Sequence, residues 1–166
     1  FNEGKQGLVE KVNMYWYGEN GTQKTTVANI LGKDLISFGS NPKYILMKSL
    51  VDLLWESQRD EEAQKKIEDL SACNVLFIDE AFDKEKLMLW KSGAQIGCID
   101  EFLRERINNN KGTIFISNKK PNEIEKQGFS HSIEDLIRRE TEKRDYFFEF
   151  KDDYFDSTGE ITATLF

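Results

Sequence analysis

The sequence is poor in the residues that build metal centres, disulfide frameworks and linkers. Its 166 residues contain one histidine, two cysteines and two prolines. A single histidine argues against a histidine-based metal centre, and Cys73 and Cys98 lack the spacing of a metal site. We interpret these cysteines as free thiols in a reducing compartment. No linker divides the chain, so we expect a single domain over residues 1–166.

Long apolar runs and an excess of positive charge are also missing. No segment approaches the ~20 apolar residues of a membrane span, and no signal peptide is recognisable. The net charge of −7 argues against a protein that coats DNA through bulk charge, but it does not argue against a local basic strip. With 39% hydrophobic and 32% charged residues, the composition indicates a soluble globular protein without a membrane partner.

Five short apolar runs alternate with helical patterns. The runs predict strands at 12–17, 44–47, 75–78, 113–116 and 146–150, and the patterns predict helices near 25–35, 50–55, 99–107 and 132–141. Ser132, with Asp135 three positions later, marks the expected start of the last helix. The charge run 59–66 indicates a solvated helix face, and 81–97 a surface insertion. This alternation predicts an α/β fold of three layers, with a mainly parallel five-stranded sheet and helices on both faces.

The stretch 15–26, YWYGENGTQKTT, carries the strongest chemical signal. An apolar run ends at Gly18, a small polar loop follows, and Lys24 and Thr25 open a helix. In the pattern G-x-x-x-x-G-K-[ST], backbone amides surround phosphates, the lysine reaches the β- and γ-phosphates, and the hydroxyl holds Mg²⁺. The following helix directs its positive end at the anion. The candidate nucleotide-binding residues are Gly18, Glu19, Asn20, Gly21, Thr22, Gln23, Lys24, Thr25 and Thr26.

Gln23 departs from this pattern, which has glycine before the lysine. Glycine has no Cβ and lets the backbone approach the phosphates closely. Two interpretations stay open at this stage. Either the loop tolerates Gln23 and binds a nucleotide, or the loop has lost that ability.

Two later strands end in polar residues that suit nucleotide hydrolysis. Asp79 and Glu80 follow the run at 75–78, and Asn118 follows the run at 113–116. Ligands of parallel sheets bind beyond the carboxyl ends of the strands, so these side chains should lie near the loop. Asp79 can hold Mg²⁺ through water, Glu80 can polarise an attacking water, and Asn118 can orient that water.

Together these segments resemble the AAA+ ATPases. The loop, LFIDE at 76–80 and IFISN at 114–118 are similar to the Walker A, Walker B and sensor 1 elements. YILMKSLVDLLW at 44–55, FLRERINNNKGTIFISNKKP at 102–121 and SIEDLIRRE at 132–140 also resemble segments of the DnaC/DnaI-type helicase loaders and of IstB, a transposition helper. The resemblance covers about 10–152 and implies a P-loop AAA+ core with a reduced or absent lid.

This resemblance implies a role for each matching residue. Lys24 would contact the β- and γ-phosphates of ATP, and Thr25 would hold Mg²⁺. Asp79 would be the Walker B metal residue, Glu80 the catalytic base and Asn118 the sensor 1 residue.

The resemblance also points to arginines that would act between subunits. Arg138 best matches the arginine finger, which stabilises transition-state charge on a neighbouring subunit's nucleotide, and Arg139 is the second candidate. The alternative is a pair of exposed helix residues. Arg106 is a weaker candidate for the subunit boundary, with a surface salt bridge as its alternative.

The function implied is that of an ATPase that assembles as a hexamer or spiral, grips single-stranded DNA and loads or remodels a replicative helicase. Its place would be the cytoplasm of a bacterium or of a phage-infected cell. The alternatives are a scaffold or regulator that does not hydrolyse ATP, and a transposition helper. We expect a partner-binding N-terminal domain to lie outside this chain. Lys84, Lys86 and Lys91, with Trp90 for base stacking, form a candidate DNA strip whose alternative is a solvated helix.

Overall fold

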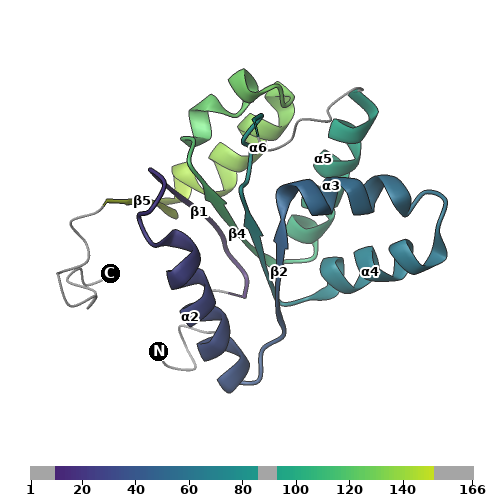
Figure 1. Cartoon of the computed structure of the whole chain (residues 1–166), viewed down its shortest axis with the longest axis horizontal. Helices are drawn as coiled ribbons and strands as arrows, with labels where there is room; N and C mark the ends of the chain where they lie inside the picture. Colours follow the sequence, from purple (N-terminus) through teal and green to yellow (C-terminus); the bar gives the residue numbers. More distant parts are fainter. Residues whose placement is uncertain (1–9, 86–92, 152–166) are drawn as a thin grey trace.

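A computed structural model describes residues 10–85 and 93–151. Within these ranges, five strands form one all-parallel sheet in the order β2-β3-β4-β1-β5 (Figure 1). The strands are β1 Asn13–Gly18, β2 Pro42–Leu46, β3 Val75–Asp79, β4 Gly112–Ser117 and β5 Phe147–Phe150. The predicted strands are thus all present, with small shifts at their ends.

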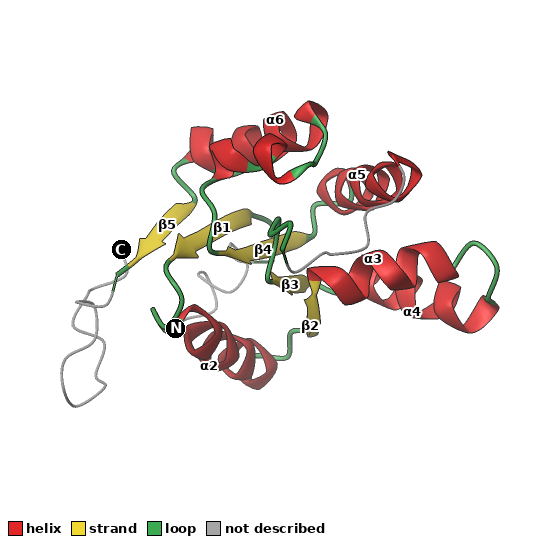
Figure 2. Cartoon of the chain, turned by 45° about the horizontal axis from the view of Figure 1, so that its top comes forward, coloured by secondary structure: helices red, strands yellow, loops and turns green. Residues whose placement is uncertain are grey.

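Helices cover both faces of the sheet, as predicted. Figure 2 shows α2 on one face and the helices α3 to α6 on the other. Their bounds are α2 Lys24–Ser37, α3 Met47–Glu56, α4 Glu61–Ala72, α5 Gly93–Asn108 and α6 His131–Glu140. Short 3₁₀ turns occur at η1 Pro121–Glu123, η2 Glu125–Gln127 and η3 Glu142–Arg144. The arrangement is the expected three-layer α/β fold.

Two apolar cores hold the layers together. β3 and β4 are buried along their whole length, because a parallel sheet covered on both faces leaves neither side of a central strand in water. Leu76, Ile78 and Phe115 face the larger core, under the face that carries α3, α5 and α6. Phe77 and Ile114 face the smaller core, which α2 covers. Successive side chains of a strand point to opposite faces of the sheet, so the position of each residue along its strand decides which helices its side chain contacts.

Two helix starts are set by capping side chains. In α4, which lies in the charge run, the Asp60 carboxylate accepts hydrogen bonds from the backbone amides of Glu62 and Ala63. The predicted start of the last helix at Ser132 is wrong. Ser130 caps α6 instead, because it has an extended backbone and its hydroxyl accepts the Ile133 amide.

Arg106 is fully buried, and both sequence-based interpretations of it are wrong. Its guanidinium lies between the end of α4 and the start of β4, and so ties α4, α5 and β4 together where the strands begin. It donates to the carbonyl oxygens of Leu70, Ser71, Cys73 and Gly112, to Oγ1 of Thr113 and to Sγ of Cys73.

Some predictions fall outside the described residues. They concern the lid after Phe150, residues 86–92 of the expected insertion, and with these Lys86, Trp90 and Lys91 of the candidate DNA strip. The described parts contradict a surface insertion, because Ala81, Phe82 and Asp83 are buried and 93–97 form the first turns of α5. Over the ranges that are described, no helix is long and apolar enough to cross a bilayer.

Candidate functional site

The carboxyl ends of three adjacent strands form the candidate site. β4 lies between β1 and β3, so the loop after β1 and the polar residues after β3 and β4 meet at one edge of the sheet. A hollow of about 340 Å³ opens there. It is lined by Asn20, Gly21, Thr22, Gln23, Lys24, Thr25, Thr26, Asp79, Glu80, Ile116, Ser117 and Asn118. The structure thus brings together the residues that the sequence placed at three separate strand ends.

The loop after β1 needs glycine at its first position. A Cβ at Gly18 would overlap the carbonyl oxygen of Phe150 on the neighbouring strand β5. Gly21 has a φ of +90° in the middle of the loop, a conformation that favours glycine. These two glycines let the chain leave β1 and turn directly into α2.

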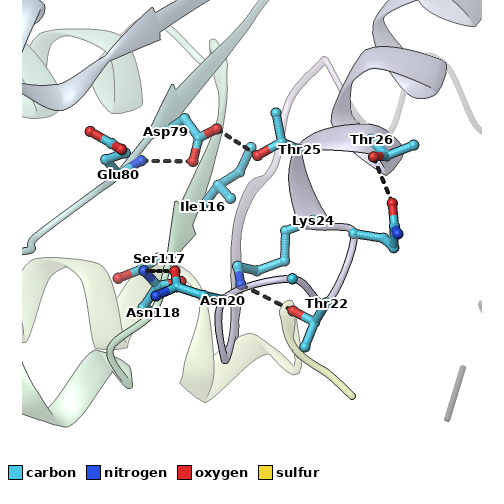
Figure 3. Close-up of a pocket in the computed structure, with 12 residues that line it drawn as sticks. Asn20, Thr22, Lys24, Thr25, Thr26, Asp79, Glu80, Ile116, Ser117 and Asn118 are labelled. Atoms are coloured by element: carbon cyan, nitrogen blue, oxygen red, sulfur yellow. Dashed lines mark hydrogen bonds between the residues drawn. The ribbon is translucent and has the colours of Figure 1, made fainter. Parts of the chain in front are cut away.

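Lys24 folds back into the loop. Its ammonium donates to the carbonyl oxygens of Gly18 at 2.9 Å and Glu19 at 2.8 Å. It also donates to the Thr22 hydroxyl at 3.1 Å (Figure 3). Burial lowers the pKa of the Lys24 ammonium, and the charge of Asp79 opposes that shift. The ammonium is therefore a buried cation whose present partners are neutral oxygens.

Gln23 occupies a left-handed backbone conformation, with φ of 62°, just before α2. A non-glycine residue there costs about 1–2 kcal/mol. Its side-chain Oε1 accepts a hydrogen bond from the Thr26 hydroxyl at 2.8 Å. In Figure 3, Thr26 lies on the other side of the helix start from the Lys24 ammonium. The glutamine side chain is therefore held on the first turn of α2, and it makes no cap to the helix amides.

Asp79 lies at the centre of the site's hydrogen bonds. Its Oδ2 accepts from the Thr25 hydroxyl at 2.8 Å and from the Tyr44 hydroxyl, and its Oδ1 accepts from the Glu80 amide at 2.7 Å. Glu80 itself has a left-handed backbone, with φ of 52°, which turns the chain sharply after β3. The Asp79 carboxylate is thus fixed by donors from α2, β2 and its own turn.

Tyr44 was missed by the sequence analysis. It comes from the edge strand β2, where it was assigned only to an apolar run. Burial of its hydroxyl, together with the hydrogen bond to Asp79 and the charge of that carboxylate, raises the pKa of Tyr44. A tyrosine two residues before a strand end has no motif that could have marked it.

Asn118 closes the hollow on the side of β4. Its Nδ2 donates to Oδ1 of Asn20 in the loop at 2.8 Å. The preceding Ser117 hydroxyl donates to the carbonyl oxygen of Ala81 at 2.6 Å, which ties the end of β4 to the turn after β3. The end of β4 is therefore linked to both other parts of the site.

Arg138 and Arg139 do not line the hollow. They lie in the last turn of α6 and form ion pairs with Glu142 at 2.7 Å and Glu140 at 3.1 Å. Their side chains remain 41% and 51% exposed, so a second molecule could reach them.

No protein-family model matches the chain, and no curated protein sequence matches it. Solved structures do match its fold. The DnaC helicase loader aligns with a TM-score of 0.70 at 18% identity, over 86% of this chain and 80% of the loader. DnaI aligns with a TM-score of 0.68 at 19% identity, over 91% of this chain and 77% of DnaI.

The replication initiator DnaA, in a structure with AMPPCP and single-stranded DNA, aligns with a TM-score of 0.72 at 14% identity over 92% of this chain. The chain spans only 44% of that DnaA structure, and 46% of a DNA replication initiation factor with the same TM-score. At these identities the likeness concerns the fold. The chain has the AAA+ P-loop fold of the kind found in DnaC, DnaI and DnaA.

Proposed function

We propose that this protein is an ATP-dependent AAA+ ATPase that loads or remodels a replicative DNA helicase. One observation carries the proposal: the hollow gathers Lys24, Thr25, Asp79, Glu80 and Asn118 beside the start of α2. Each is a residue type that ATP hydrolysis uses at its position: Lys24 and Thr25 begin α2, and Asp79, Glu80 and Asn118 lie at the ends of β3 and β4. A site that had lost this chemistry would not have to retain all five.

The loop and the start of α2 would hold the phosphates. The Gln23 side chain does not cap the N-terminus of α2, so the first amides of the helix are available to an anion, and the helix dipole favours negative charge there. The Lys24 ammonium, now bonded to loop carbonyls, would turn to the β- and γ-phosphates.

The residues around Asp79 fit Mg²⁺. Mg²⁺ prefers oxygen ligands and keeps several waters, so it needs few protein groups. The Thr25 hydroxyl and the Asp79 carboxylate supply such oxygens 2.8 Å apart at the hollow. When bound, Mg²⁺ would neutralise phosphate charge. Glu80 would activate the attacking water, and Asn118 would orient it beside the γ-phosphate.

Hydrolysis would require a second copy of the chain. Arg138, with Arg139 as the second candidate, would reach a neighbour's nucleotide from the exposed end of α6. This arrangement supports the proposal of a ring or spiral oligomer. Its partners would be a helicase and single-stranded DNA, a proposal supported by the fold shared with the DnaC helicase loader and with DnaA solved on single-stranded DNA.

The trans arrangement can be tested by mixing two inactive variants. We expect Glu80→Gln and Arg138→Ala each to bind ATP, and each to hydrolyse it at least about 1,000-fold more slowly than wild type, because a base or an arginine finger is lost. Mixed in equal amounts, they should regain roughly a quarter of the wild-type rate, since one interface in four then has both residues. The measurement is steady-state phosphate release with single-stranded DNA present.

Other outcomes of the mixing experiment separate the alternatives. No recovery on mixing, with each variant inactive alone, would contradict an arginine finger that acts in trans. A wild type that binds ATP but releases no phosphate would instead favour the scaffold that does not hydrolyse ATP.

Gln23 should not block the nucleotide. We expect Gln23→Gly to change ATP affinity by less than about twofold, because the glutamine side chain is already bonded to Thr26, away from the Lys24 ammonium. The free energy of unfolding should change by no more than about 1 kcal/mol, since relief of the left-handed backbone offsets the added freedom of glycine in the unfolded chain. Calorimetry with Mg²⁺ and urea unfolding measure the two quantities. ATP binding that appears only in Gln23→Gly would show that the natural loop is disabled.

A further inference from the structure

The Asp79 carboxylate receives two hydroxyl donors on one oxygen. Among the residues that the structure describes, Thr25 and Tyr44 both donate to Oδ2, whereas Oδ1 receives only the Glu80 amide. A carboxylate oxygen has two lone pairs, so Oδ2 is fully used and Oδ1 retains one. The hydrogen bonds that Asp79 accepts therefore leave Oδ1, rather than Oδ2, to bind a further group.

Tyr44 reaches Asp79 from the edge of the sheet. In the register of β2 against β3, Tyr44 lies beside Phe77 and Leu46 beside Asp79, so Tyr44 and Asp79 belong to the face that α2 covers. Tyr44 is 43% exposed, and it is among the few large hydrophobic side chains on the described surface. Its ring is poorly buried, so packing alone gives little reason for a tyrosine here. The hydroxyl bond to Asp79 supplies one.

We propose that Tyr44 is a positioning residue for the metal bound with the nucleotide. It holds Oδ2 of Asp79 together with Thr25, and so leaves the free lone pair of Oδ1 to accept from the hydration shell of Mg²⁺. Groups that orient metal-binding side chains typically change metal affinity or activity 10–100-fold when they are removed. This inference rests on the proposed nucleotide site and adds a residue to it from outside the loop and strand-end motifs.

Tyr44→Phe tests this role by removing one hydroxyl and keeping the ring. ATP affinity is measured by calorimetry across a Mg²⁺ titration and again with the metal chelated. We expect the Mg²⁺ concentration for half-maximal tightening to rise about tenfold, with the affinity for metal-free ATP unchanged. Tyr146→Phe is the matched control. Tyr146 precedes β5, at the end of the sheet where the strands begin, and its substitution should leave the Mg²⁺ titration as in wild type.

The outcomes distinguish this inference from the proposed function. Suppose that Mg²⁺ increases the ATP affinity of the wild type and that Tyr44→Phe gives the same Mg²⁺ titration. This result would overturn the role of Tyr44 alone. A variant that loses affinity equally with and without Mg²⁺ would also overturn it, because the hydroxyl would then support the loop rather than the metal. A wild type that binds no nucleotide would overturn the proposed function and this inference together.

Discussion

Replacing Lys24 with alanine should weaken ATP binding by about 100-fold. The Lys24 ammonium makes three hydrogen bonds, all to oxygens of the loop that would surround the phosphates. Exchanging neutral oxygens for phosphate oxygens gives the buried cation partners of opposite charge. Charge-assisted hydrogen bonds contribute about 1.5–3 kcal/mol each, so losing one or two of them accounts for about 3 kcal/mol. Each 1.4 kcal/mol is a factor of about ten in affinity.

Lys33→Ala is the control for this measurement. Lys33 is exposed and lies in the same helix, α2, so its loss removes an equal charge without touching the loop. We expect ATP affinity within about twofold of wild type for this control, by calorimetry in the same buffer. Equal affinities for Lys24→Ala and wild type would show that the hollow does not bind phosphates through this lysine. The thermal unfolding midpoint of each variant establishes that it is folded during the titration.

The sequence predicted the elements and the three strand ends because their signals are local. Continuous apolar runs indicated the buried strands β3 and β4, and the change to polar residues marked where each strand ends. The strand order β2-β3-β4-β1-β5 is a property of long-range pairing, which periodicity does not encode. That order places the ends of β1, β4 and β3 side by side.

Tyr44 shows the limit of motif-based interpretation. Its partner Asp79 lies 35 positions later, and the contact exists only because β2 pairs with β3 in one register. A shift of one residue would turn Tyr44 to the other face of the sheet. Gln23 shows the same limit within the loop, since its side-chain direction depends on a bond to Thr26 that the pattern does not specify.

Arg106 could have been placed correctly from its spacing. Ile99, Phe102, Leu103 and Arg106 follow at i, i+3, i+4 and i+7, which puts the arginine on the buried stripe of α5. The charge of Arg106 led to the prediction of a surface position, and that prediction was wrong. A buried arginine is tolerated here because α4 ends next to it, with carbonyl groups that have no partner in their own helix.

Arg106→Met should therefore lower the free energy of unfolding by about 3–5 kcal/mol. Methionine keeps much of the volume but donates no hydrogen bonds, so the buried carbonyl oxygens of Leu70, Ser71 and Gly112 lose the guanidinium donor, and Leu70 retains the weaker Cys73 thiol. Each unsatisfied buried group costs about 1–3 kcal/mol. The free energy of unfolding of a small domain is only about 5–15 kcal/mol, so this loss is a large share of the total. The measurement is urea unfolding followed by circular dichroism.

Arg104→Met provides a matched control for that loss. Arg104 lies two residues earlier in α5, with its side chain 42% exposed, where it pairs with Asp100 at 3.0 Å and donates an exposed hydrogen bond to the Ser132 hydroxyl at 2.7 Å. An exposed ion pair contributes about 0–1 kcal/mol, so this variant should remain within about 1 kcal/mol of wild type. If Arg106→Met were equally mild, the methionine would have compensated by packing, as apolar replacements of buried charges sometimes do.

Arg106→Met also tests whether the stability of the fold and the binding of ATP depend on the same residues. Arg106 bonds residues where the strands begin, whereas the hollow lies where they end. We therefore expect folded Arg106→Met, measured well below its unfolding midpoint, to bind ATP within about threefold of wild type. If the fully folded variant bound ATP much more weakly, the hydrogen bonds of Arg106 would also determine where β3 and β4 place Asp79 and Asn118. The arginine would then couple to the site, although none of its bonds reach it.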